Sequence, residues 1–292
     1  MKKEKVFGKK EYSEINELLN RKINEKKILV AVHRGTSAGN IIENTVPAYR
    51  ASLLSGGDMI EVDVIKSTDG IYYAFHDGNE KRLLNKRKNI KEMSSGEIEK
   101  NGFNNSIGEK TEYKTERLDT VLKYFEGKDV LINIDRAWEY FEDLLVFFDK
   151  YNVRKQLIIK SAPEKEFFEI FRKHKVKYMY MPIVKTEKDV ELTLNQKNIN
   201  IVGFELIAEN EKSLFFKDEY IGKLQKEGYF VWVNSIKLND LTNLYAGYDD
   251  SKAILEGFDK GWGVLINKGV DIIQTDWPSL LAGYIKELKK RF

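Results

Sequence analysis

Short runs rich in β-branched residues alternate along this 292-residue chain with longer amphipathic segments. Such alternation is typical of parallel βα units, in which each helix returns the chain to the same edge of a sheet. No strand candidate is followed by a glycine-rich dinucleotide or P-loop motif, so a nucleotide-binding sheet has no support. We therefore predict an α/β fold of the (β/α)8 TIM-barrel type. The strand candidates are 28–33, 59–66, 71–76, 130–135, 156–161, 177–183, 200–206, 229–234 and 271–275.

These nine strand candidates exceed the eight places of such a barrel. Ser67-Thr68-Asp69-Gly70 is a turn signature that leaves no room for a helix between two of them. We therefore interpret 71–76 as the return strand of a hairpin after the second barrel strand. Pairing across this turn is expected to place His76 opposite Glu61, and strand alternation keeps Glu61 and Asp63 on one face.

The length of the chain suits one barrel, so we expect a single domain over residues 1–292. Residues 1–27 are expected to form an N-terminal helical segment that closes the bottom of the barrel, with Ser13 as its cap. Residues 78–115 are polar and irregular, and we expect a small insertion over the barrel mouth there. A second irregular stretch, 244–263, is expected to add to the rim.

Composition excludes several classes of function. The net charge of +3, from 49 basic and 46 acidic residues, gives no basis for binding nucleic acid, which needs a concentrated basic face. The chain has no cysteine, which excludes disulfides and thiol chemistry. No segment approaches the ~20 apolar residues of a membrane span. As written the chain is expected to be cytoplasmic, although one trimmed of its export signal would look the same. The sequence does not indicate an oligomeric state.

Polar residues stand at the carboxyl ends of otherwise apolar strands, where barrel enzymes place their chemistry. The first strand candidate ends at His33, the second contains Glu61 and Asp63, and the next barrel strand ends at Asp135. Comparable positions on later strands are held by Lys160, Glu205, Asn234 and Asp276.

Three of these acidic residues are candidate metal ligands: Glu61, Asp63 and Asp135. Two inward carboxylates on one strand repel each other unless a positive charge holds them. A site of carboxylates without cysteine favours a hard divalent cation, Ca²⁺ or Mg²⁺, over zinc. The alternative is that these acids are solvated or paired with nearby lysine and arginine.

His33 and His76 are the candidate general base and general acid. An imidazole pair beside clustered carboxylates suits metal-assisted, acid–base phosphate chemistry, because both rings titrate near neutral pH. The sequence does not say which ring is the base. His174, the third histidine, lies among lysines near a helix end and is interpreted as a surface residue.

The order of four motifs resembles the opening of the glycerophosphodiester phosphodiesterase family. They are His33-Arg34-Gly35, Glu43-Asn44-Thr45, Glu61-Val62-Asp63 and His76-Asp77. Weaker similarity continues through Trp232-Val233-Asn234 to Thr275-Asp276-Trp277-Pro278, so the resemblance spans about residues 28 to 290. It implies a TIM barrel that hydrolyses small glycerophosphodiesters to sn-glycerol 3-phosphate and an alcohol.

The resemblance adds substrate-binding candidates. Arg34 can offer a bidentate fork to a phosphate, although a structural ion pair is its rival. In similar proteins the glutamate of the second motif reaches the metal or glycerol region, which makes Glu43 a candidate, while Asn44 could instead cap a helix. Trp232 could pack against the glycerol or headgroup, with core burial as the alternative. Lys160 and Glu205 complete the set.

The chain departs from the family pattern at the third metal ligand. The family usually has glutamate and lysine in an ExK motif, whereas this chain reads Asp135-Arg136-Ala137. Lys160 is expected to supply the missing cation, and strand alternation would turn Arg136 to the opposite face.

Three functions remain open. The first is metal-dependent hydrolysis of glycerophosphodiesters by two histidines, with water or a neighbouring substrate hydroxyl as nucleophile. The second is a lipid phosphodiesterase or a cyclising lyase similar to sphingomyelinase D. The third is a non-catalytic barrel that binds a phosphate-bearing ligand or a partner.

Overall fold

The computed structural model describes residues 4–239 and 241–291. Its centre is a closed barrel of eight parallel strands, in which β1 pairs with both the second and the last barrel strand. The TIM-barrel prediction is confirmed. The barrel strands are β1 (Leu29–Val32), β2 (Met59–Lys66), β7 (Leu131–Asp135), β8 (Leu157–Ser161), β9 (Met179–Val184), β10 (Gly203–Leu206), β11 (Phe230–Asn234) and β12 (Ile272–Thr275).

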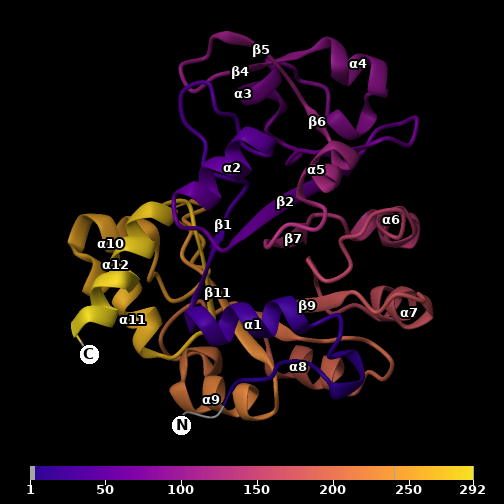
Figure 1. Cartoon of the computed structure of the whole chain (residues 1–292). Coiled ribbons are helices and arrows are strands. Elements are labelled where there is room, and N and C mark those ends of the chain that lie inside the picture. Colours follow the sequence, from indigo (N-terminus) through magenta and orange to yellow (C-terminus); the bar gives the residue numbers. More distant parts are fainter. Residues whose placement is uncertain (1–3, 240, 292) are drawn as a thin grey trace.

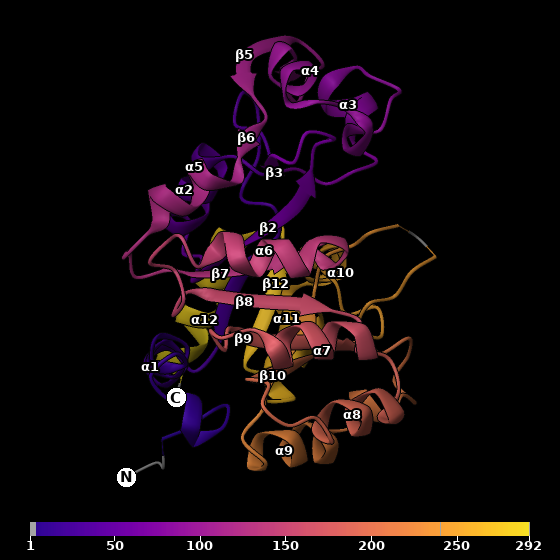
Figure 2. The ribbon, with the colours of Figure 1, turned by 90° about the vertical axis from the view of Figure 1, so that its right-hand side faces the viewer.

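Helices that follow these strands along the chain surround the barrel (Figures 1 and 2). They are α2 (Val46–Leu54), α5 (Leu118–Phe125), α6 (Phe141–Phe148), α7 (Lys165–Lys173), α8 (Glu187–Leu194), α9 (Asp218–Lys226), α10 (Asp250–Glu256), α11 (Trp262–Asn267) and α12 (Pro278–Arg291). The stretch 244–263 was expected to be irregular, but α10 and the start of α11 lie within it. Gly257 and Gly261 flank the short turn between these two helices and interrupt their periodicity.

Strand alternation separates two apolar layers. Outward residues such as Val30 and Val32 pack against the helices, whereas inward residues such as Leu29 and Ala31 fill the barrel. The inner cluster also contains Leu19 of α1 (Glu17–Lys26), the helix that lies at the lower end of the barrel in Figure 1. Because α1 begins at Glu17, the predicted cap Ser13 is wrong.

The hairpin register differs from the predicted one. Strand β3 (Tyr72–Ala74) pairs antiparallel with β2, and Lys66 lies opposite Tyr72. The turn therefore holds five residues, closed by the Ser67 N–H, which donates to the Ile71 carbonyl at 2.9 Å. The shift of one residue puts Phe75 beside Asp63, with its N–H donating to the Asp63 carbonyl at 3.1 Å. His76 thus lies beyond β3 and not opposite Glu61.

Residues 78–115 lie over the carboxyl end of β2, at the top of Figures 1 and 2. Their elements are α3 (Glu80–Leu84), α4 (Ser95–Lys100), β4 (Gly102–Asn104) and β5 (Lys110–Lys114), followed by β6 (Glu116–Arg117), which pairs with β3. A separate hydrophobic cluster, with Phe75, Ile90 and Phe103 at its centre, holds this segment together. Within the described residues, no helix is long and apolar enough to cross a membrane.

Candidate active site

An open cavity of about 1250 Å³ lies at the carboxyl ends of the barrel strands. His33, Arg34, Asp63, His76 and Asp135 line one side of it, and the loops after β9, β10 and β11 line the other. The four motifs that begin at His33, Glu43, Glu61 and His76 therefore lie at the wall of this cavity or directly beneath it.

The three candidate metal ligands come together. Glu61 and Asp63 project from β2 into the barrel, and Asp135 ends β7, where it lies in register beside Asp63. One carboxylate oxygen of each residue lies within 4.8 Å of the other two. Carboxylates at this spacing on neighbouring strands can share one divalent cation.

The electrostatics of these carboxylates fit a cation. Burial and the neighbouring Asp63 carboxylate raise the pKa of Glu61 to about 8, so its negative charge is poorly compensated by the protein alone. Asp135 differs, since the Lys160 ammonium at 2.9 Å holds its pKa below the usual range despite burial. Arg34 contacts Asp63, with Nε 3.2 Å from Oδ2. Basic side chains thus contact two of the three acids, whereas none contacts the Glu61 carboxylate within the described residues.

His33 follows β1, and its Nδ1 lies 2.9 Å from the Asp276 carboxylate. A carboxylate accepts, so Nδ1 carries the proton and Nε2 is the free nitrogen. Burial lowers the pKa of His33, but the bond to Asp276 and the charge of Glu61 outweigh it and raise the pKa overall.

His76 follows β3, and its Nδ1 lies 2.6 Å from the backbone carbonyl of Asp77. The carbonyl can only accept, so Nε2 is again the free nitrogen. Burial lowers the pKa of His76, and although Asp63 opposes this, the Arg34 and Arg136 cations reinforce it. Both histidines line the cavity with the same tautomer.

The first motif is shaped by its backbone. Arg34 has a left-handed φ of 53°, and its N–H donates to Glu61 Oε2 at 2.8 Å. Gly35 follows with a φ of 79°, where a Cβ would come within 2.8 Å of the Ala48 Cβ. Only glycine allows this turn to pack against α2.

Glu43 lies outside the carboxylate cluster and does not line the cavity. It accepts from Arg34 Nη1 at 3.2 Å and from Arg82 Nη2 of the insertion at 2.7 Å. Glu43 therefore reaches the cavity only through Arg34, and its predicted role near the metal or glycerol stays a prediction. Asn44 does not cap α2 either, because Thr45 does, and the Asn44 amide instead donates to Asp63 Oδ2 at 2.9 Å.

Arg136 contradicts the prediction that it points away. Strand geometry ends at Asp135, and Arg136 takes a left-handed φ of 54°, which turns its side chain to the cavity. Its Nε and Nη2 lie 3.0 and 2.9 Å from Asp77 Oδ1. The alternation of side chains between the two faces of a strand therefore does not predict the direction of a residue beyond the last paired one.

Lys160 and Glu205 line the cavity and contact each other, with Nζ 3.2 Å from Oε2. Asn234 donates to Glu205 Oε1 at 2.7 Å. Trp232 lies beneath them in the inner cluster, fully buried and absent from the cavity wall. Direct contact between Trp232 and a substrate is therefore wrong, and core burial is its observed role.

Sequence reasoning assigned no role to the groups that support His33. Asp250 of α10 is buried, accepts from the Asp276 N–H and Thr275 Oγ1, both at 2.8 Å, and accepts from Trp262 Nε1 at 2.8 Å. The only sequence signal for this support was the position of Asp276 among the polar residues at strand ends. Trp262 is buried and not part of a rim, and His174 lies outside the cavity beside Asp149.

Two family models match the chain. The glycerophosphoryl diester phosphodiesterase family matches residues 33–217, which is more than half of the chain. A domain of unknown function matches residues 180–285.

Two curated relatives cover different shares of the chain. A glycerophosphodiester phosphodiesterase of Caldanaerobacter subterraneus is 33% identical over 144 residues, which cover 46% of this chain and 58% of that protein. The chain thus spans little more than half the length of this relative. The uncharacterized protein YqiK of Bacillus subtilis is 23% identical over 88% of this chain and 98% of its own length.

Solved structures share the fold. A glycerophosphoryl diester phosphodiesterase from Parabacteroides distasonis superposes with a TM-score of 0.73 at 18% identity, over 97% of this chain and 94% of that one. A phosphodiesterase from Oleispira antarctica, solved in complex with the product sn-glycerol-3-phosphate, gives a TM-score of 0.59 at 18% identity, over 88% and 96%.

Proposed function

Because the chain belongs to the glycerophosphoryl diester phosphodiesterase family, we propose that it hydrolyses glycerophosphodiesters to sn-glycerol 3-phosphate and an alcohol. The observation that carries this proposal is the meeting of two imidazoles and three carboxylates at one cavity. The C. subterraneus relative and the product complex of the O. antarctica neighbour support the substrate class.

Glu61, Asp63 and Asp135 would hold one divalent cation, Ca²⁺ or Mg²⁺. Bound there, it would neutralise the non-bridging phosphate oxygens as negative charge builds on them. Arg34 lines the same cavity and would bind the phosphate through the N–H groups that Glu43 and Asp63 leave free.

The two histidines would exchange protons with the substrate at Nε2. One imidazole takes the proton of the attacking oxygen as that oxygen bonds to phosphorus. The other gives its proton to the leaving oxygen as the bond between phosphorus and the alcohol breaks. Asp276 and the Asp77 carbonyl fix the tautomers that make this exchange possible.

The test is turnover of a panel of glycerophosphodiesters by chelated protein, with Ca²⁺ or Mg²⁺ restored separately. We expect His33→Ala and His76→Ala to lose at least about a hundredfold in kcat, the range for a positioned acid or base. His174→Ala is the matched control and should keep wild-type activity. Phosphorus NMR of the products separates hydrolysis from a cyclising lyase, which would accumulate cyclic phosphate.

Metal binding is tested separately by calorimetric titration of the chelated protein. The wild type should bind one divalent cation, and the double variant Glu61→Gln with Asp63→Asn should not. Equal binding by both proteins would exclude this metal site, and absence of turnover with either metal would exclude the proposed reaction.

A further inference from the structure

Two arginines stand in equivalent places on either side of β2. Arg34 follows β1 and Arg136 follows β7, the two barrel strands that pair with β2. Both have left-handed backbones, with φ of 53° and 54°. A left-handed arginine costs on the order of 1–2 kcal/mol, so such a conformation persists where surrounding contacts impose it. In both cases the conformation brings the side chain to the cavity wall.

The guanidinium of Arg136 is held firmly. Nε and Nη2 contact Asp77 Oδ1, and the group lies 5.6 Å from the centre of the Trp138 ring. Trp138 lines the cavity as well. Within the described part of the chain, Nη1 of Arg136 has no hydrogen-bond partner, so donors remain for a ligand.

The acidic partner of Arg136 is not its alone. Asp77 is the acidic partner of Arg136, and it is shared with Lys91, whose Nζ lies 3.4 Å from Oδ2. One carboxylate therefore faces two cations, of which Lys91 also contacts Glu139. The charges of Arg34 and Arg136 both act on His76, whose pKa they help to lower against Asp63. His76, Arg34 and Arg136 all line the same cavity.

We propose that Arg136 is a second phosphate-binding residue and acts together with Arg34 on the diester phosphate. This inference rests on the proposed function of the cavity. Two guanidinium groups on either side of the strand that carries Glu61 and Asp63 would contact the phosphate from two directions. Each charge-assisted hydrogen bond strengthens as the phosphate gains negative charge, so both arginines would stabilise the transition state.

The rival role is purely positional: Arg136 would only hold Asp77, whose carbonyl fixes His76. The two roles differ in what they do to anion binding. A phosphate contact contributes to the affinity for sn-glycerol 3-phosphate, whereas a positional role changes turnover and leaves that affinity unchanged. Asp77→Asn weakens the same ion pair but keeps the guanidinium, which makes it the matched comparison.

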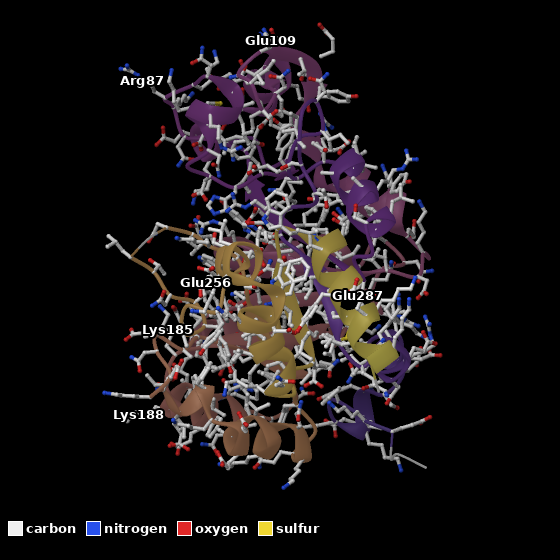
Figure 3. The ribbon with its side chains drawn as sticks, turned by 90° about the vertical axis from the view of Figure 1, so that its left-hand side faces the viewer. Arg87, Glu109, Lys185, Lys188, Glu256 and Glu287 are labelled. Atoms are coloured by element: carbon white, nitrogen blue, oxygen red, sulfur yellow. The ribbon has the colours of Figure 1, made fainter. Side chains whose placement is uncertain are left out.

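The experiment measures kcat, KM and the inhibition constant of sn-glycerol 3-phosphate. For Arg136→Gln we expect the inhibition constant to rise at least about tenfold, the scale of a lost charge-assisted hydrogen bond. Arg136→Lys should recover part of this affinity, and Asp77→Asn should keep most of it. Arg87→Gln is the control, because Arg87 is exposed on the insertion and points away from the barrel (Figure 3).

A wild-type inhibition constant in Arg136→Gln, or an equal rise in Asp77→Asn, would overturn the inference while leaving the proposed function intact. If the wild type hydrolyses no diester, the proposed function fails instead. In that case, calorimetric titration with sn-glycerol 3-phosphate tests the role of Arg136. Weaker binding by folded Arg136→Gln or Arg136→Lys than by the wild type supports the inference. Unchanged binding, or no binding by the wild type, rejects it. Thermal melting establishes that each variant is folded.

Discussion

His33 and Asp276 meet at 2.9 Å, although 243 positions separate them in the chain. The contact joins the residue after the first barrel strand to the residue after the last, at the seam where β1 pairs with β12. Asp276 is itself fixed by the Asp250 carboxylate, which accepts its backbone N–H at 2.8 Å. The orientation of one candidate catalytic ring therefore depends on the closure of the barrel.

Replacing Asp276 with asparagine should impair catalysis through His33. We expect kcat to fall about a hundredfold, because the neutral amide no longer fixes the tautomer or stabilises the imidazolium. The pKa of His33 should also fall, since the Asp276 bond raises it, and the limb of the pH profile that reports His33 should move to lower pH. Kinetics from pH 5 to 9 measure both effects.

Glu287→Gln is the control for that substitution, because Glu287 is exposed on α12 (Figure 3) and lies outside the cavity wall. An Asp276→Asn protein with the wild-type pH profile would show that the contact is structural only.

Asp250 should make stability depend on pH. Burial raises its pKa to about 6, above the ~3.9 of an unfolded aspartate. The stabilisation from its protonated form is therefore complete below about pH 4 and is lost as the pH rises through 6. A gap of this size corresponds to roughly 3 kcal/mol. We expect the advantage of the wild type over Asp250→Asn to be largest below pH 4, to shrink between pH 4 and 6, and to level off above pH 6.

Urea unfolding of both proteins at pH 4, 5, 6 and 7 measures that difference. A constant difference across this range, or one that grows with pH, would show that Asp250 is charged in the folded protein at low pH.

Trp232 should affect stability and not substrate affinity. Its ring is fully buried, and Nε1 donates to Asn234 Oδ1 at 2.8 Å, so Trp232→Phe removes volume and leaves an acceptor unpaired. We expect a loss of about 1–3 kcal/mol in the free energy of unfolding with an unchanged KM. Trp277→Phe is the matched control, because that side chain is 52% exposed. A raised KM with unchanged stability would restore the substrate-contact hypothesis.

The sequence predicted the barrel and its acidic strand ends well, because both depend on local patterns. The period of two along β2 alone puts Glu61 and Asp63 on the inner face, where the structure has them. The predicted hairpin register was wrong by one residue because the turn includes Ile71 as its fifth residue. Turn length is set by backbone hydrogen bonds, which a pattern of residue types does not show.

Other parts of the site depend on contacts between distant segments. Arg136 turns into the cavity only because strand β7 ends one residue earlier, and Asp77 from the hairpin holds it there. The link from Arg82 through Glu43 to Arg34 requires the insertion to fold back over the barrel. The spacing of residues within one strand or helix does not predict contacts between distant segments, so these roles could be assigned only from the folded structure.

Strand β2 carries two of the three acidic residues of the site at alternate positions, with Val62 between them facing the helices. A shift of one residue in this strand would turn both carboxylates into the apolar layer against the helices and bring Val62 inward. Loops around the mouth can lengthen or shorten without this effect. An insertion or deletion within β2 would therefore dismantle the acidic cluster, whereas a change of loop length at the mouth would leave it intact.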